Sequence, residues 1–292
     1  MEVGTAVAVL PEASRWLSAA IEAGGGRLVD LERAQALVWD AGSPGDLERV
    51  LASAKGVRWV QLSWTGVDRY LPLMGDGRTW PCARDVYGPG VAEHALALVL
   101  GVLKGATRTA RDPTWSKYEP RTLFGARVVI VGGGSIGRSL AGLLEPFECR
   151  VRMVTRRTRS QLSEALGGAA VVFLALPLTP ETDGIIGEPE LRAMGPQAVL
   201  VNVARGRLVR TDQLVRALRE GWIAGAGLDV TEPEPLPGGH PLWSLPNCVI
   251  TPHIASVDAM AQEPYSRLVS ENVRRFAVGE PLLGVVDPVR GY

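Results

Sequence analysis

A glycine-rich turn at residues 131–137 (VGGGSIG) constrains the fold of this chain more than any other stretch. The run before it, residues 127–131, is short, apolar and β-branched, which predicts a strand, and the residues after it predict a helix. Gly132, Gly134 and Gly137 have the spacing of a dinucleotide-binding turn. In such a turn the first glycine permits the bend, the second lets a pyrophosphate approach the backbone, and the third lets the helix pack against the strand. The stretch therefore predicts a Rossmann-type domain.

The start of the predicted helix offers free backbone N–H groups and the positive end of a helix dipole. Both attract phosphate groups. We therefore expect cofactor contacts from the turn and the helix start, at Gly132, Gly134, Ser135, Ile136 and Gly137.

Strand and helix patterns alternate along the chain, which indicates parallel sheets covered by helices on both faces. Before a Gly-Pro-Gly hinge at 88–90, the pattern predicts strands at 3–10, 36–39 and 57–62 and helices at 12–23 and 44–54. After it, the pattern predicts strands at 127–131, 150–154, 170–176, 198–203, 223–230 and 249–251 and helices at 91–104, 136–144, 213–220 and 258–278. The sequence thus predicts two α/β domains, each built on a doubly wound parallel sheet.

Composition narrows the classes of partner and compartment. The chain has 292 residues, 46% hydrophobic and 21% charged, which is enough for two globular domains. Basic and acidic residues balance at 31 each, so we expect no nucleic-acid partner and no membrane partner. The three cysteines have neither metal-ligand spacing nor a disulfide pattern, so we expect no metal site and a cytoplasmic location. We also expect no signal peptide, and the apolar helical run at 95–103 is too short to span a membrane.

Polar residues follow several predicted strands of the second half, where ligands of open α/β sheets bind. They are Arg205, Asp229, Glu234 and His253. Arginine offers a planar fork for a carboxylate or carbonyl oxygen, and histidine can exchange a proton near neutral pH. A carboxylate can hold that histidine in one tautomer and favour its charged form. Beside a dinucleotide site, this set indicates hydride transfer to a keto acid, whereas His94 and His240 are interpreted as structural.

Several segments together resemble the D-isomer-specific 2-hydroxyacid dehydrogenases. They occur in that family's order and are VAEHALAL (91–98), VGGGSIG (131–137), LALPLTPET (174–182), VNVARGRLV (201–209), GAGLDVTEPEPLP (225–237) and HPLWSLPNCVITPHIAS (240–256), followed by a fitting tail at 271–287. The resemblance implies that Arg205 binds the substrate, that His253 is the acid/base, and that Glu234 is the partner of His253.

The resemblance also implies a split fold. A Rossmann-type cofactor domain, residues 89–257, would be inserted into a smaller flavodoxin-like substrate domain, residues 1–88 plus 258–292. The substrate carboxylate would bind a loop containing Trp64, Thr65 and Gly66, in which Trp64 replaces the small residues usual for the family. Further cofactor contacts are expected from Pro177, Thr182, Val203, Ala204 and Asp229.

The function that follows is reduction of a small 2-keto acid to the D-2-hydroxy acid, with glyoxylate or hydroxypyruvate as substrates that the resemblance makes plausible. Two alternatives stay open: a non-catalytic regulator that senses NAD(P), and a dehydrogenase of a small inorganic or one-carbon anion on the same scaffold. The helix at 91–104 is too apolar to face water, and the resemblance places it at a two-fold interface, so we expect a homodimer.

The residues after the second strand of the cofactor domain indicate which nicotinamide cofactor is used. NAD-binding folds usually place Asp or Glu there, to bond the ribose hydroxyls. This chain instead has Thr155, Arg156 and Arg157, which can bond and neutralise a 2′-phosphate. We therefore expect NADP(H) to be favoured, with NAD(H) as the alternative. The short segment between Arg156 and Ala169 departs from the family and affects the adenine-side pocket.

Overall fold

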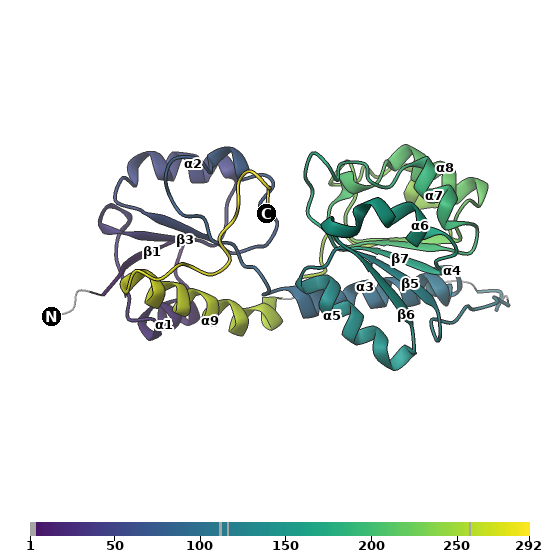
Figure 1. Cartoon of the computed structure of the whole chain (residues 1–292), viewed down its shortest axis with the longest axis horizontal. Helices are drawn as coiled ribbons and strands as arrows, with labels where there is room; N and C mark the ends of the chain where they lie inside the picture. Colours follow the sequence, from purple (N-terminus) through teal and green to yellow (C-terminus); the bar gives the residue numbers. More distant parts are fainter. Residues whose placement is uncertain (1–3, 111–112, 116, 257) are drawn as a thin grey trace. The chain divides into compact units, whose positions relative to one another are not determined.

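Two parallel sheets, one in each of two units, organise the chain in the computed structural model (Figure 1). The first unit comprises residues 1–87 and 258–292, and the second comprises residues 88–257. The structure describes residues 4–110, 113–115, 117–256 and 258–292. Residue 3 of the strand predicted at 3–10, and residue 257 at the predicted domain boundary, lie outside the described residues.

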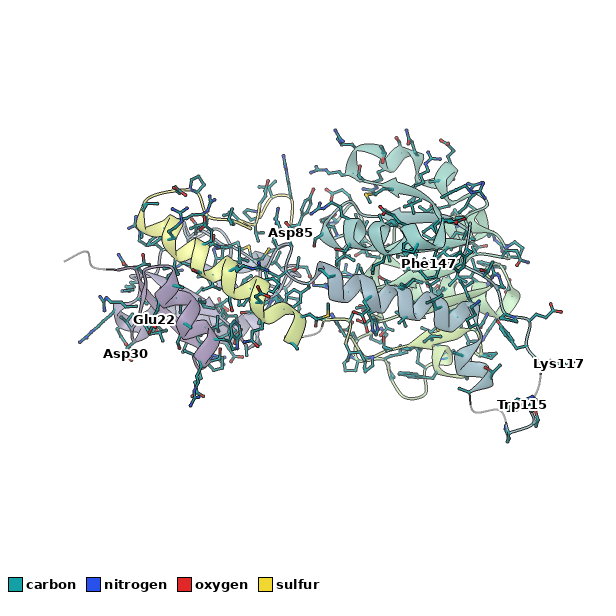
Figure 2. All side chains as sticks on the ribbon, turned by 90° about the horizontal axis from the view of Figure 1, so that it is seen from below. Glu22, Asp30, Asp85, Trp115, Lys117 and Phe147 are labelled. Atoms are coloured by element: carbon teal, nitrogen blue, oxygen red, sulfur yellow. The ribbon has the colours of Figure 1, made fainter. Side chains whose placement is uncertain are left out.

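The first unit has a four-stranded parallel sheet in the order β2-β1-β3-β4. Its strands are β1 (Ala6–Leu10), β2 (Arg27–Leu28), β3 (Ala36–Trp39) and β4 (Trp59–Leu62). Helices α1 (Arg15–Ala23) and α9 (Asp258–Ala277) cover one face, and α2 (Pro44–Ser53) covers the other (Figure 1). Figure 2 shows α9 running beside α1, although more than two hundred residues separate them in sequence. Two short 3₁₀ turns, η1 (Leu31–Arg33) and η2 (Leu71–Leu73), complete this unit.

Local sequence explains where these helices begin. The Ser14 hydroxyl accepts the Leu17 N–H and caps α1. At α2, Ser43 and Asp46 form a reciprocal capping box around Pro44, which occupies the first helical position. The C-terminal segment then returns to this sheet, because Val286 N–H donates to the Trp80 carbonyl and the buried Asn272 amide bonds Gln61 of β4.

The second unit has a six-stranded parallel sheet in the order β10-β9-β8-β7-β5-β6. Its strands are β5 (Arg127–Val131), β6 (Arg150–Val154), β7 (Val171–Leu174), β8 (Val199–Asn202), β9 (Gly225–Leu228) and β10 (Cys248–Ile250). Helices α3 (Gly88–Leu103) and α5 (Ser135–Leu144) cover one face, and α6 (Leu162–Leu166), α7 (Glu188–Met194) and α8 (Thr211–Glu220) cover the other (Figure 1). The shorter elements are α4 (Ala106–Thr109), η3 (Glu145–Phe147), η4 (Arg156–Gln161), η5 (Gly206–Leu208) and η6 (Pro241–Ser244).

The strand order places a topological switch point beside the glycine-rich turn. The chain leaves β5, pairs β6 on one side, and then returns to pair β7 on the other side of β5. Connections that diverge in this way open a crevice at the carboxyl ends of the strands. The two doubly wound parallel sheets confirm the predicted fold class.

Some elements differ from the sequence prediction. The long helix begins at Gly88 rather than Val91, because Pro89 fits the first turn of a helix and the predicted hinge continues into α3. Strand β9 covers only residues 225–228, where two glycines let α3 approach: a Cβ on Gly227 would lie 2.9 Å from Leu98 Cβ. The prediction had no β2, α6 or α7, each of which has seven residues or fewer.

Candidate active site

The turn after β5 has the geometry that a pyrophosphate requires. Gly132 has φ of +124°, and a Cβ there would lie 2.0 Å from the Ala175 carbonyl oxygen. A Cβ on Gly137 would lie 2.1 Å from the Gly132 carbonyl oxygen, so neither position accepts a side chain. Gly134 is different, because a Cβ there would meet nothing within 4 Å. Gly134 also precedes the first residue of α5 without a side-chain cap, so the turn leaves open space at a helix N-terminus suited to phosphate.

The residues after β6 lie next to this turn. A Cβ on Gly133 would lie 2.9 Å from the Thr155 methyl carbon, so Thr155 contacts the glycine-rich backbone. Arg156 and Arg157 are exposed in the 3₁₀ turn that follows. The hydroxyl of Thr179, a backbone N–H, and the charges of Arg156 and Arg159 lower the pKa of Glu181 from its usual value. The arginines that follow β6 therefore lie close enough to act on a neighbouring carboxylate.

Two loops at the carboxyl edge contain other predicted cofactor residues. After β7, the Thr182 hydroxyl donates to the Pro177 carbonyl oxygen over 2.8 Å and shapes the turn. After β8, Val203 and Ala204 are buried, and Ala204 N–H donates to the Asn202 side chain over 3.1 Å. Asn202 is a positioning residue that the sequence did not reveal, since an asparagine at the end of a buried strand has no distinctive pattern.

Arg205 follows directly and is half-buried. Its guanidinium donates to the Ala204 carbonyl oxygen over 2.7 Å, and its own carbonyl accepts the Asn202 amide over 2.8 Å. These bonds fix the backbone on both sides of the arginine. The guanidinium has five N–H donors in a planar fork, a geometry suited to a carboxylate or carbonyl oxygen of a ligand.

His253 and Glu234 form a contact between two loops of the second unit. His253 Nδ1 lies 2.6 Å from Glu234 Oε1, and the two side chains are 47% and 41% exposed. A carboxylate at this distance accepts the Nδ1 hydrogen, so Nε2 is the ring nitrogen left to exchange a proton with a ligand. His253 has φ of +55°, an uncommon conformation for a residue with a side chain.

Asp229 lies behind this histidine with a fully buried side chain. Its Oδ1 accepts the Thr251 hydroxyl over 2.6 Å and the Ile254 N–H over 3.0 Å, and its Oδ2 accepts the Ala255 N–H over 3.0 Å. The backbone carbonyl of Asp229 accepts the His253 N–H over 2.8 Å. The sequence predicted Asp229 as a cofactor contact and did not reveal this role in the turn that contains His253.

The predicted substrate loop follows β4 in the first unit. The Thr65 hydroxyl donates to the Ala83 carbonyl over 2.9 Å, and the Trp64 carbonyl accepts the Ala83 N–H over 3.2 Å. The Trp64 ring packs against Tyr70, with ring centroids 5.7 Å apart. Among the described residues, the N–H groups of Thr65, Gly66 and Val67 have no acceptor within the chain, so this loop has backbone donors for an anion.

Comparison with known proteins decides the family. Residues 93–255 match the model of the D-isomer specific 2-hydroxyacid dehydrogenase NAD-binding domain, which is more than half of the chain. The chain belongs to the D-isomer specific 2-hydroxyacid dehydrogenase family. It is therefore an NAD(P)-dependent oxidoreductase, and its second unit is the nicotinamide-binding Rossmann domain of this family.

Two sequence relatives extend the comparison. An uncharacterized protein of Corynebacterium melassecola is 35% identical over 297 residues, which cover 94% of this chain and 96% of that protein. A glyoxylate reductase of Pyrococcus furiosus is 40% identical over 220 residues, which cover 67% of this chain. That match spans 65% of the archaeal enzyme, just under two thirds of its length.

Solved structures of the family share the whole architecture. A D-isomer specific 2-hydroxyacid dehydrogenase of Xanthobacter autotrophicus, in complex with NADPH and MES, is 29% identical with a TM-score of 0.84, covering 99% of this chain and 100% of that one. An NADPH-dependent glyoxylate/hydroxypyruvate reductase of Sinorhizobium meliloti, in complex with NADP and sulfate, is 25% identical with a TM-score of 0.81, covering 99% and 100%.

In the part of the chain that the structure describes, no helix is long and apolar enough to cross a membrane, and no group of three or more His, Cys, Asp or Glu side chains could hold a metal ion. The three cysteines are free thiols, and burial raises the pKa of Cys248 to about 12, so this thiol stays protonated at neutral pH.

Proposed function

We propose that this dehydrogenase reduces a small 2-keto acid to the D-2-hydroxy acid, with His253 as the proton donor. The observation that carries the proposal is the 2.6 Å contact between His253 Nδ1 and Glu234. In this proposal the two ring nitrogens have different roles, because Nδ1 donates its hydrogen to the carboxylate and Nε2 protonates a carbonyl oxygen.

The remaining residues bind and orient the reactants in this proposal. The reduced nicotinamide supplies the hydride to the keto carbon. Glu234 accepts the Nδ1 hydrogen and so holds His253 in one tautomer and orientation, and the Arg205 guanidinium bonds the substrate and polarises its carbonyl. Main-chain groups near Val203 and Ala204, together with Asp229 Oδ2, hold the carboxamide of the nicotinamide. Asp229 Oδ2 accepts one hydrogen bond within the protein, from the Ala255 N–H, and a carboxylate oxygen can accept a second.

We further assign the first unit as the substrate domain, residues 1–88 plus 258–292, and residues 89–257 as the cofactor domain. The free N–H groups of Thr65 and Gly66 would bind the substrate carboxylate. We propose a short substrate such as glyoxylate or hydroxypyruvate. The names of the archaeal and Sinorhizobium relatives support the same class of substrate.

The cofactor preference in this proposal is for NADPH. Thr155 contacts the glycine-rich turn, two exposed arginines follow it, and no carboxylate occupies the position that an NAD-specific site uses. Charge-assisted bonds to a 2′-phosphate contribute about 1.5–3 kcal/mol. A preference of about tenfold in kcat/KM requires only about 1.4 kcal/mol of that.

Steady-state kinetics with both cofactors tests the function and the preference together. Wild type should oxidise NADPH with one or more acids from a panel of 2-keto acids, and should prefer NADPH to NADH by about tenfold or more. Small anions are tested in the opposite direction, as hydride donors to NADP+ or NAD+. The double variant Thr155→Asp, Arg156→Ala should lose or reverse that preference. A wild type that prefers NADH would contradict the cofactor assignment. Turnover of no keto acid would contradict the function and favour the sensing or small-anion alternatives.

We also propose that the enzyme is a cytoplasmic homodimer that associates through α3. On this helix Leu96 and Leu100 are half-buried and Ala97 is exposed, so an apolar stripe remains after the helix has packed on its own sheet. Trp115, in the same unit, is 93% exposed and projects into solvent (Figure 2). The three free thiols fit a reducing compartment.

A further inference from the structure

His94 contacts a buried hydrogen-bond network that reaches the loop of His253. It lies on α3, and its Nε2 is 2.8 Å from the Thr251 hydroxyl and 3.2 Å from Asp229 Oδ1. Thr251 follows β10 and Asp229 follows β9, so the histidine joins a helix to two neighbouring strand ends. The His94 side chain is only 20% exposed.

The direction of these bonds follows from counting hydrogens. Thr251 has a single hydroxyl hydrogen, and the 2.6 Å distance to the Asp229 carboxylate assigns that hydrogen to Asp229. The hydrogen between Thr251 and His94 must then belong to His94 Nε2. His94 is therefore a donor to Thr251 Oγ1, and Asp229 Oδ1 lies 3.2 Å from the same nitrogen.

The same carboxylate holds the turn that contains His253. Both oxygens of Asp229 accept backbone N–H groups from the two residues after His253, and its carbonyl accepts the N–H of His253 itself. A non-glycine residue in the left-handed conformation, such as His253, is strained and persists only where surrounding bonds hold it. A fully buried carboxylate in turn requires a complete set of donors, since burial without them is costly.

We propose that His94 is a positioning residue for the reaction, which completes the donor set of Asp229 through Thr251 and thereby holds His253 in its left-handed conformation. The proposal rests on the proposed function of His253, and it adds a residue that touches neither the substrate nor the cofactor. Its chemistry requires a hydrogen-bond donor at the position of Nε2, and it does not require an imidazole.

A matched pair of variants separates the donor from the ring. His94→Gln can place an amide N–H near the position of Nε2, whereas His94→Leu fills similar space and donates nothing. His240→Leu is the control, because His240 is a histidine of the same unit whose ring accepts the Leu242 N–H. Two measurements are needed: steady-state kinetics on the best keto acid, and hydrogen exchange of the backbone amides of His253, Ile254 and Ala255 in the free protein.

We expect His94→Leu to lower kcat by about tenfold or more, with the Kd for the cofactor changed less than kcat, and to speed exchange of the three turn amides by about tenfold relative to amides of β7. His94→Gln should restore both properties to within about threefold of wild type, and His240→Leu should change neither. If His94→Leu does not fold, Thr251→Val removes the bridging hydroxyl at nearly constant shape and should give the same local increase in exchange.

Two results would overturn the proposal. One is a folded His94→Leu or Thr251→Val variant in which the amides of residues 253–255 exchange hydrogen at the wild-type rate. The other is a folded His94→Gln variant as impaired as His94→Leu, which would make the ring itself the requirement. The exchange measurement involves no substrate, so a wild type without keto-acid reductase activity would contradict the proposed function and leave this test intact.

Discussion

At the scale of single residues, the proposed chemistry depends on which side-chain atoms are hydrogen-bonded within the protein and which can bond a ligand. His253 commits Nδ1 to Glu234 and keeps Nε2 for a ligand. The Arg205 guanidinium donates to the Ala204 carbonyl, and the Asn202 amide donates to the backbone carbonyl of Arg205. Behind His253, the buried Asp229 carboxylate accepts hydrogen bonds from both the side chain and the backbone of the following loop.

The first prediction concerns Arg205. Arg205→Lys keeps the positive charge and loses the planar fork that bonds a carboxylate or carbonyl through two parallel N–H groups. We expect kcat/KM for the keto acid to fall by about tenfold to a hundredfold, with the Kd for NADPH within about twofold of wild type. Kinetics and cofactor titration on the same preparations check this, and unchanged kcat/KM in the lysine variant would assign Arg205 to the surface.

Some of these residues could be predicted from the sequence, and others could not. Arg205, Glu234 and His253 could be named because each follows a strand and has side-chain chemistry that suits a keto acid. His94 was interpreted as structural, because its contact with Asp229 joins residues 135 positions apart that nothing in the local pattern connects. The roles of Asn202 and Thr251 could not be predicted either, because a buried hydrogen bond to another loop produces no periodic pattern in the sequence.

At the scale of elements, the junction of β5 and α5 divides its glycines into two kinds. Gly132 and Gly137 are required by the protein itself, because a Cβ at either would lie about 2 Å from a carbonyl oxygen. Gly134 is not required by the packing of the protein itself, since a Cβ there would meet nothing within 4 Å. Its φ of −73° is also available to alanine.

The second prediction uses this difference. Gly134→Ala should unfold at a denaturant midpoint close to that of wild type, while its Kd for NADPH rises by about tenfold or more because the methyl group occupies the space of the pyrophosphate. Gly137→Ala should lower the free energy of unfolding by about 1–3 kcal/mol or more, since the backbone must shift to accept the methyl group. Urea unfolding and fluorescence titration measure both. Wild-type NADPH affinity in Gly134→Ala would contradict the assigned pyrophosphate position.

Element prediction succeeded where the hydrophobic pattern was long or bounded by glycine and proline. All six strands of the second unit were predicted, as were α2, α5 and α9 to within a few residues. Shorter elements were missed because a strand of two residues such as β2, or a helix of five such as α6, is stabilised by tertiary packing and has too few residues for a period to emerge. The start of α3 was misplaced because Gly88-Pro89-Gly90 has the composition of a hinge and the geometry of a helix start.

At the scale of the whole molecule, the apolar stripe of α3 predicts the assembly. We expect a homodimer at micromolar concentration, with twice the mass of one chain by light scattering coupled to size exclusion. Leu100→Arg should shift the protein toward monomer, because the charged side chain cannot be desolvated at an apolar contact. Ser18→Arg on α1 of the other unit is the matched control and should leave the mass unchanged. A monomeric wild type would contradict the prediction.

The most direct test of the central claim is the rate of NADPH oxidation with the best 2-keto acid, measured across pH for wild type, His253→Ala and Glu234→Gln. A positioned acid contributes about a hundredfold to ten-thousandfold, so we predict a fall of that size in kcat for His253→Ala, with cofactor binding intact. Glu234→Gln should lose less activity than His253→Ala, because the amide oxygen can still accept the Nδ1 hydrogen and keep the ring oriented. A His253→Ala variant that retains most of the wild-type turnover would contradict the account.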